Sequence, residues 1–273
     1  MLNCRNCGAE LSHSDRYCPN CGQGVAEGQE RCLIPLLKSA LIEVTSVDSR
    51  LWRSLGALVL KPGLLAREYR AGRRRRYLSP IGLFLLGNLL YFLAPPLSDL
   101  QLSLTEQYEL QPYRHLITPW VDSYIAVSGS SFDEVARRYE LRIAELAKIM
   151  VILFVPLVAL VTMVLFADRR LYFADHLVLA LHYMAFLLLY FISTGALAAF
   201  AYLLIPERLP SSAVTIMLLA HFVYLPPMFK RAFDVSWWRA LVTAPIFVFG
   251  FFLAHITYRY VQFNIAFLLT TLA

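Results

Sequence analysis

The sequence predicts an all-α polytopic membrane protein, a bundle of about five transmembrane helices with a small zinc ribbon at its N-terminus. Hydrophobic residues make up 58% of the 273 residues and charged residues only 16%, more apolar surface than a soluble domain of this size can bury. The formal net charge is +6, and Lys and Arg gather at the ends of the apolar runs, which is typical of membrane proteins. Two closely spaced cysteine pairs indicate the ribbon.

Residues 1–24 are predicted to form the zinc ribbon, because they carry two knuckles of the form Cys-x-x-Cys-Gly. Glycine after the second cysteine allows the tight turn that brings both sulfurs to one ion. Four thiolates complete a tetrahedral shell with no open position for water, so the Zn²⁺ is expected to be structural. Two disulfides are the alternative, but paired thiols suit a reducing compartment and so favour a cytoplasmic N-terminus. The predicted ligands are Cys4, Cys7, Cys18 and Cys21.

A short linker is predicted over residues 25–33, followed by amphipathic and basic juxtamembrane helices over residues 34–77. Apolar residues there recur at helical spacing, which suits a helix in the membrane interface or one packed on other protein. After the break at Lys61-Pro62-Gly63 comes a basic cluster, expected to face anionic inner-leaflet lipids and to fix the topology of the next segment. We call this cluster the basic collar: Arg67, Arg70, Arg73, Arg74, Arg75 and Arg76.

Residues 78–273 are predicted to form the transmembrane domain. The expected spans cover residues 78–97, 149–166, 174–205, 212–229 and 240–258. Residues 98–144 carry an excess of acidic side chains and are expected outside the cytoplasm. The turn from Ser128 to Ser131, followed by Asp133 and Glu134, is expected to be a capped entry into the helix of the second span. Basic loops after the second and fourth spans mark the cytoplasmic side. The apolar tail from Val261 to Leu272 is expected outside or in the outer interface.

Polar side chains within the predicted spans form a candidate intramembrane site, since ionisable groups are costly in lipid and often functional. Asp175 and His182 are seven residues apart and share a helix face, so they could line one cavity. Histidines placed this way could relay protons or ions, bind a divalent metal or haem, or hydrogen-bond between packed helices. The sequence leaves these three readings open. The candidate residues are Asp175, His176, His182 and His221.

Several motifs together resemble those of a family of uncharacterised bacterial multi-pass inner-membrane proteins. They are the paired Cys-x-x-Cys-Gly ribbon, the stretch from Lys61 to Tyr77, and the stretch from His176 to Phe186. The resemblance extends from Cys4 to about Phe229 and implies a location in the bacterial inner membrane. It implies no activity.

The sequence favours a non-enzymatic membrane scaffold or regulatory component, whose ribbon and basic collar dock a protein partner, another copy of the chain or the lipid surface. Basic and acidic residues balance in residues 1–24, which disfavours nucleic-acid binding. A small transporter or channel with an intramembrane His/Asp pathway is the alternative. A membrane metalloenzyme is the second alternative, although the chain has no HExxH or GxSxG motif.

Overall fold

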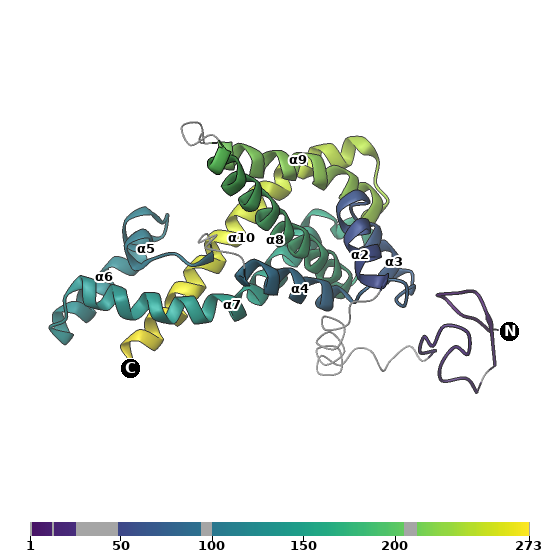
Figure 1. The fold of residues 1–273 in the computed structure, drawn as a ribbon, viewed down its shortest axis with the longest axis horizontal. Helices are drawn as coiled ribbons and strands as arrows, with labels where there is room; N and C mark the ends of the chain where they lie inside the picture. The colour runs from purple at the N-terminus through teal and green to yellow at the C-terminus, as the bar shows by residue number, and fades with distance from the viewer. Residues whose placement is uncertain (1, 13, 26–48, 94–99, 205–211, 273) are drawn as a thin grey trace.

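The computed structural model describes residues 2–12, 14–25, 49–93, 100–204 and 212–272, and its helices confirm the predicted all-α fold (Figure 1). Two short strands, β1 (Leu2–Asn3) and β2 (Glu10–Leu11), pair antiparallel in the ribbon. The helices are α2 (Ser49–Leu60), α3 (Leu64–Arg70), α4 (Pro80–Leu93), α5 (Leu104–Leu110), α6 (Arg114–Ser128), α7 (Phe132–Leu165), α8 (Phe173–Leu204), α9 (Ser212–Phe233) and α10 (Trp237–Thr271).

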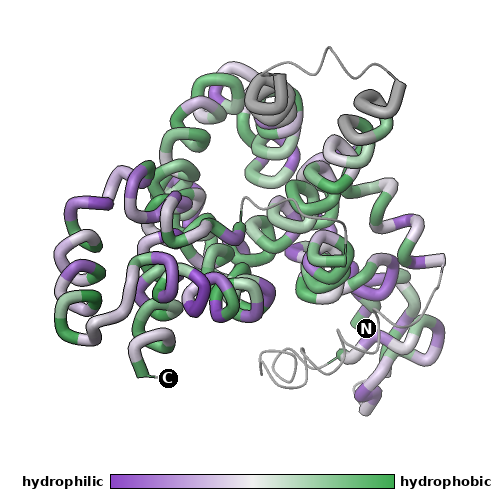
Figure 2. Tube along the Cα trace, turned by 60° about the vertical axis from the view of Figure 1, so that its left-hand side comes forward, coloured by the Kyte–Doolittle hydropathy of each residue, from purple (hydrophilic) through white to green (hydrophobic). Residues whose placement is uncertain are grey.

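Three helices in the described part of the chain are long and apolar enough to cross a membrane. They are α7, the Phe173–Leu197 portion of α8, and α10. Hydrophobic residues, drawn in green, occupy much of the helical part of the chain in Figure 2. An apolar side chain that stays exposed on such a helix suits lipid better than water, so the composition and the helix lengths both indicate an integral membrane protein.

The described residues therefore give fewer full-length spans than the predicted number of about five. The predicted first span, 78–97, contains α4, which has only 14 residues. At about 1.5 Å per residue α4 reaches ~21 Å, short of the ~30 Å hydrocarbon layer. It lies along α8, where Gly87 lets it approach the backbone of Ala185 closely. Residues 94–97, the predicted linker from residue 26 onward, and residues 34–48 of the predicted juxtamembrane region lie outside the described residues.

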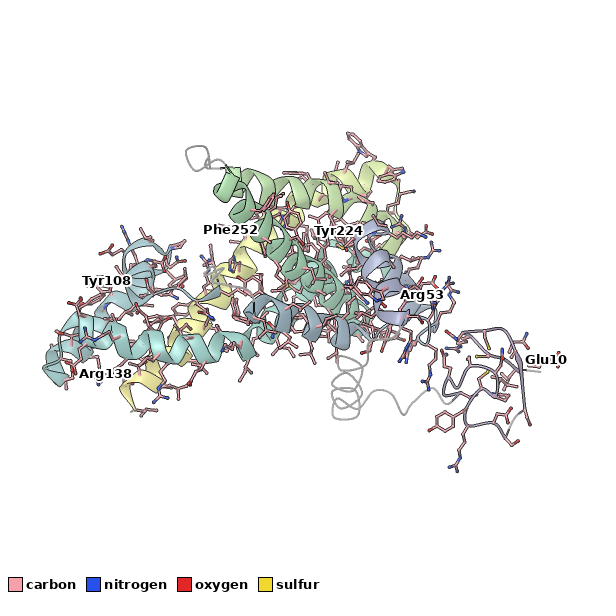
Figure 3. All side chains as sticks on the ribbon, viewed as in Figure 1. Glu10, Arg53, Tyr108, Arg138, Tyr224 and Phe252 are labelled. Carbon is pink, nitrogen blue, oxygen red and sulfur yellow. The ribbon has the colours of Figure 1, made fainter. Side chains whose placement is uncertain are left out.

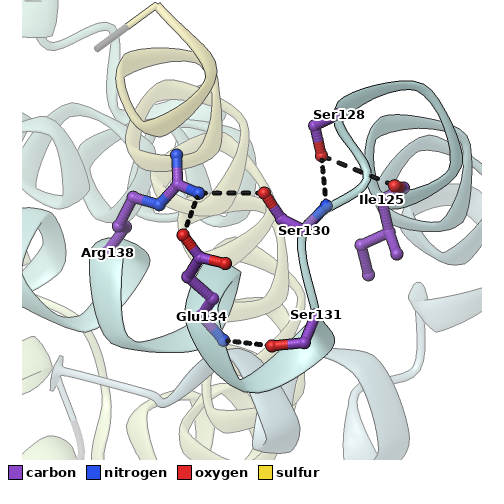
Figure 4. A network of polar contacts seen from close by, with 6 residues as sticks. All are labelled: Ile125, Ser128, Ser130, Ser131, Glu134 and Arg138. Atoms are coloured by element: carbon purple, nitrogen blue, oxygen red, sulfur yellow. Dashed lines mark hydrogen bonds and ion pairs between the residues drawn. The ribbon is translucent and has the colours of Figure 1, made fainter.

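Helix α7 begins where the sequence predicts, because the Ser131 side chain accepts a hydrogen bond from the backbone N–H of Glu134 (Figure 4). Arg138 then bonds both the Glu134 carboxylate and the Ser130 hydroxyl, which ties the first turn of α7 to the preceding loop. The helix continues for 34 residues without a break. Its length is ~51 Å at 1.5 Å per residue, about 20 Å more than is needed to cross a hydrocarbon layer of ~30 Å.

Helix α10 also continues beyond its predicted end. The expected fifth span stops at residue 258 and leaves a separate apolar tail, but α10 is continuous from Trp237 to Thr271. The reason lies in its last turns, where Phe263, Ala266 and Phe267 form a buried stripe at helical spacing. That stripe packs against α6 and the first half of α7, with the Phe267 ring 4.8 Å from Trp120.

These segments form a second hydrophobic core, separate from the core of the remaining helices. We call this unit, α5, α6 and the adjoining halves of α7 and α10, the cap. Inside it the Tyr113 hydroxyl donates to the side-chain oxygen of Gln107, whose amide in turn donates to Tyr139. The cap contains most of the predicted extracytoplasmic segment 98–144 together with the C-terminal turns of α10.

The turn at Lys61-Pro62-Gly63 joins α2 and α3 and presses against α9. Gly63 has φ 79°, and a Cβ at this position would lie 2.4 Å from the carbonyl oxygen of Met228. The carbonyl of Pro62 accepts a hydrogen bond from Arg231. The hydroxyl of Tyr224, which is labelled in Figure 3, donates to the carbonyl of Leu58 at 2.9 Å. The α2–α3 hairpin is therefore fixed to the last turns of α9.

Candidate metal centre and basic collar

The four ribbon cysteines come together as the sequence predicts. All four sulfurs lie within 4.8 Å of one another, with Cys4 3.7 Å from Cys21 and Cys7 3.6 Å from Cys18. A tetrahedral Zn–S₄ centre with bonds of about 2.3 Å has sulfur–sulfur edges of ~3.8 Å, whereas a disulfide bond is ~2.05 Å long. The spacing fits a metal ion at the centre and does not fit two disulfides.

The two knuckles share the same backbone conformation. Gly8 donates its N–H to the carbonyl of Cys4 and Gly22 donates to that of Cys18, each at 2.8 Å. Both glycines have positive φ, 78° and 69°, a region in which a side chain would be strained. The glycine in each knuckle therefore permits the tight turn that the sequence analysis assigned to it.

The chemistry of the cluster favours a soft divalent metal. Thiolate sulfurs select zinc over hard cations such as Mg²⁺ or Ca²⁺. A backbone N–H from Ala9 lowers the pKa of Cys7 to about 6, whereas desolvation raises the pKa of Cys18 to about 11, so without a metal the cluster does not favour the thiolate at every ligand. Four ligands close the coordination shell, so bound zinc would supply folding energy to the ribbon and no site for a reacting water.

The second knuckle is attached directly to the basic collar. The Gln23 side chain donates to the carbonyl of Gly72 at 2.7 Å, and its oxygen accepts the backbone N–H of Arg74 at 3.4 Å. The Arg75 guanidinium donates to the carbonyl of Gly22. We call these contacts the clasp. Because Gly22 ends the second knuckle and Gln23 follows it directly, these contacts connect the collar loop to the fold of the ribbon.

Several collar arginines bind within the protein, contrary to the expectation that the whole cluster faces lipid headgroups. Arg70 donates to the carbonyl of Ala232 in α9 at 2.6 Å. Arg73 makes a bidentate ion pair with Glu68 at 2.5 and 2.6 Å. Arg74 lies over the Tyr69 ring at 4.5 Å and Arg76 over that of Tyr77 at 5.8 Å, and both side chains, like Arg67, remain exposed.

Two residues important to this arrangement were not singled out from the sequence. Gln23 lies within the predicted ribbon, and Gly72 lies within the stretch from Lys61 to Tyr77, but the sequence analysis gave neither residue a role of its own. Gly72 has φ 81°, and a Cβ there would lie 3.0 Å from Cδ of Arg5. A glycine directly after a basic helix was the available signal, since such a position often needs positive φ.

Glu68 is the buried anchor of the collar, and its removal gives a testable result. Arg73 holds the pKa of Glu68 below its usual value of 4.5. A lowered carboxyl pKa stabilises the fold above the unfolded-state value, and this contribution is lost as pH falls below ~4.5. Glu68→Gln should lower the free energy of unfolding at pH 7 by about 1 kcal/mol and reduce the loss of stability on acidification. Thermal unfolding between pH 7 and pH 4 measures both.

The matched control is Glu109→Gln, which neutralises an exposed carboxylate in the cap. It should leave the pH dependence of unfolding unchanged, because exposed carboxylates contribute little to stability. Equal effects of the two substitutions would contradict an anchoring role for Glu68.

The candidate intramembrane residues take separate neighbours. His176 is buried and its Nδ1 lies 3.1 Å from the Thr162 hydroxyl of α7, whereas Nδ1 of His182 lies 2.8 Å from the carbonyl of Val178 in its own helix. His221 is also buried, with its ring 5.7 Å from that of Phe251.

Asp175 does not join these histidines. Its carboxylate accepts the N–H of Tyr172 at 3.1 Å at the start of α8, so it caps the helix. Among the described residues, the four cysteines are the only group of three or more His, Cys, Asp or Glu side chains whose ligand atoms converge. This arrangement favours packing by hydrogen-bonded histidines over a second metal or haem site.

The short loops between spans meet at the end of the bundle that carries the collar. Asp168, in the turn after α7, makes a bidentate ion pair with Arg239 of α10 at 2.6 and 2.7 Å. Exposed aromatic residues flank these loops, as expected at a membrane–water boundary: Tyr172, Trp237 and Trp238. The Arg-rich loops and the cysteine cluster thus lie on the same side of the spans.

Residues 48–92 match a family model described as "Protein of unknown function (DUF3667)". The match covers less than half of the chain, but it includes α2, α3, the basic collar and nearly all of α4. Neither a search of curated proteins nor a search of solved structures gave a match. The comparison thus shows a local similarity to a family of unknown function, centred on the hairpin that carries the collar.

Proposed function

We propose that the chain is a non-enzymatic protein of the bacterial inner membrane, in which a cytoplasmic zinc ribbon docks a protein partner. The clasp carries this proposal. Gln23 and Arg75 hold the ribbon against the collar at the end of the bundle, so the ribbon presents its outer surface at a fixed place. Figure 3 shows Glu10 on the side of the ribbon away from the helices.

The ribbon has the features of a small recognition module. Its Tyr17 side chain is 64% exposed, and exposed tyrosines are enriched in protein interfaces. A closed metal centre stiffens such a short chain, which lowers the entropy lost on binding. Free thiols and Arg-rich loops on one side of the spans support a cytoplasmic position for the ribbon. A transporter finds less support, because the candidate histidines take separate local neighbours.

Site-specific photocrosslinking in cells tests the docking role. A photoreactive phenylalanine analogue at position 17 should give a defined cross-linked adduct, and the same group at Val127 in the cap should not give that adduct. Val127 is the matched control because its side chain is also strongly exposed, at 89%. Adding Cys18→Ser should remove the adduct at position 17, because the ribbon loses its metal. An adduct common to both positions, or one that survives Cys18→Ser, would contradict docking by the folded ribbon.

A further inference from the structure

The four ribbon sulfurs differ in their access to solvent. Cys4 and Cys18 are buried and Cys21 is half-buried. Cys7, in contrast, is exposed. The backbone beside it is open as well, since a Cβ at Gly8 would meet nothing within 4 Å. A small oxidant in solution therefore reaches the sulfur of Cys7 more easily than the other three.

The second knuckle is covered by the basic collar, unlike the first. A Cβ at Gly22, which corresponds to Gly8, would lie 3.9 Å from the guanidinium of Arg75. Cys18 of this knuckle lies inside the cluster, and its sulfur is 3.6 Å from that of Cys7. A disulfide between these two sulfurs requires an approach of only about 1.5 Å. An accessible thiolate beside a second thiolate is typical of oxidation-sensitive cysteine pairs.

We propose that Cys7 is an oxidation site for hydrogen peroxide and that Cys18 is its resolving thiol, so that oxidation produces a Cys7–Cys18 disulfide. Bound zinc would keep both sulfurs as thiolates, the form that reacts with peroxide. The Cys7 sulfur takes one oxygen of the peroxide as the O–O bond breaks, which gives a sulfenic acid and hydroxide. The Cys18 sulfur then forms the S–S bond and displaces a second hydroxide. The two thiolates have lost two electrons, the peroxide has gained them, and solvent protons convert both hydroxides to water.

Oxidation at this site reaches the collar through Cys18. The disulfide removes two of the four ligands, so the ribbon loses the metal that it needs for its fold. The backbone N–H of Cys18 donates to the carbonyl of Gln23, and its carbonyl accepts the N–H of Gly22, both at 2.8 Å. Gly22 and Gln23 form the ribbon side of the clasp, so unfolding of the second knuckle releases the collar loop. The oxidation site needs no docking partner at Tyr17, so either assignment can fail alone.

The test uses the full chain with one bound zinc in detergent micelles, on a Cys32→Ser background that leaves the four ribbon cysteines as the thiols of the chain. Hydrogen peroxide is added, zinc release is followed with a colorimetric chelator, and the disulfide is identified by peptide mapping after alkylation. We expect a Cys7–Cys18 disulfide that appears together with the released zinc, and recovery of zinc binding after reduction with dithiothreitol. Amide hydrogen exchange should become faster at Arg74, whose N–H bonds Gln23 in the clasp, and stay unchanged in α6.

Histidine variants separate the oxidation site from a general weakening of the cluster, because a Cys₃His shell still binds zinc. Cys7→His removes the accessible thiolate and should slow the release of zinc by peroxide about tenfold or more. Cys21→His is the matched control, since it keeps both reacting sulfurs and should release zinc within about threefold of the rate of the Cys32→Ser chain.

Three results would overturn the proposal: retention of zinc under excess peroxide, zinc release without a Cys7–Cys18 disulfide, or equal slowing in the two histidine variants. The disulfide mapped in the Cys32→Ser chain decides the matter where a histidine variant binds no zinc.

Discussion

Replacing Cys4 and Cys18 with serine is expected to abolish metal binding and unfold the ribbon, while the helical bundle remains. Each substitution removes one ligand from a different sulfur pair of the tetrahedral cluster. Structural zinc contributes about 10–16 kcal/mol of apparent binding free energy in comparable small modules, and that free energy drives their folding. Metal analysis of the purified protein should therefore fall from one zinc per chain to none. Far-UV circular dichroism should change little, because the strands among the described residues of the ribbon are two residues long each.

Cys32→Ser is the matched control for the zinc prediction. It removes a thiol close to the ribbon in sequence that is not one of the four clustered cysteines, so the zinc content should stay at one per chain. Full zinc occupancy in the double serine variant would exclude the proposed ligand set. A second metal ion that survives the loss of the ribbon zinc would instead point to the buried histidines.

Gly63→Ala should destabilise the protein by about 2–5 kcal/mol. The new Cβ would lie 2.4 Å from the carbonyl oxygen of Met228 and 3.2 Å from the backbone nitrogen of Ala232, so α9 or the turn must move. Positive φ at this residue adds the cost of a left-handed conformation. The measurement is thermal unfolding in detergent, followed by circular dichroism.

Gly56→Ala is the corresponding control in the neighbouring helix. A Cβ at Gly56 meets nothing within 4 Å, and the residue lies inside α2. Alanine there should stabilise the helix by about 0.5–1 kcal/mol, because it restricts the unfolded chain more than glycine does. If Gly63→Ala proved as stable as the unsubstituted protein, the turn could not press against α9 as described.

The N-terminal site was predictable because its determinants are local. Two Cys-x-x-Cys-Gly knuckles specify both the ligand set and the turns, and the structure brings the four sulfurs of Cys4, Cys7, Cys18 and Cys21 together. The start of α7 was predictable for the same reason, since Ser131 caps the helix through a residue three positions away. The assignment to the membrane-protein class was possible from amino-acid composition alone, because composition does not depend on which helices contact one another.

The extent of the membrane segments was less predictable. Hydropathy marks the apolar windows but not the helix ends, so it placed a boundary at residue 258 in a helix that continues to Thr271. The continuation depends on Phe263 and Phe267 meeting α6 and α7, contacts between segments more than one hundred residues apart. The packing of α4 along α8 likewise joins segments that are far apart in the sequence.

The sequence by itself predicted the four-cysteine cluster and the membrane class, because residue type, composition and short spacing decide these properties. Only the tertiary structure decided which partners the polar side chains bind. It directed Arg70 to α9, paired Arg73 with Glu68, joined Gln23 to the collar, and gave each buried histidine its own neighbour. Hydrogen bonds and ion pairs act over about 3 Å, so their partners are known only when distant segments are placed next to one another.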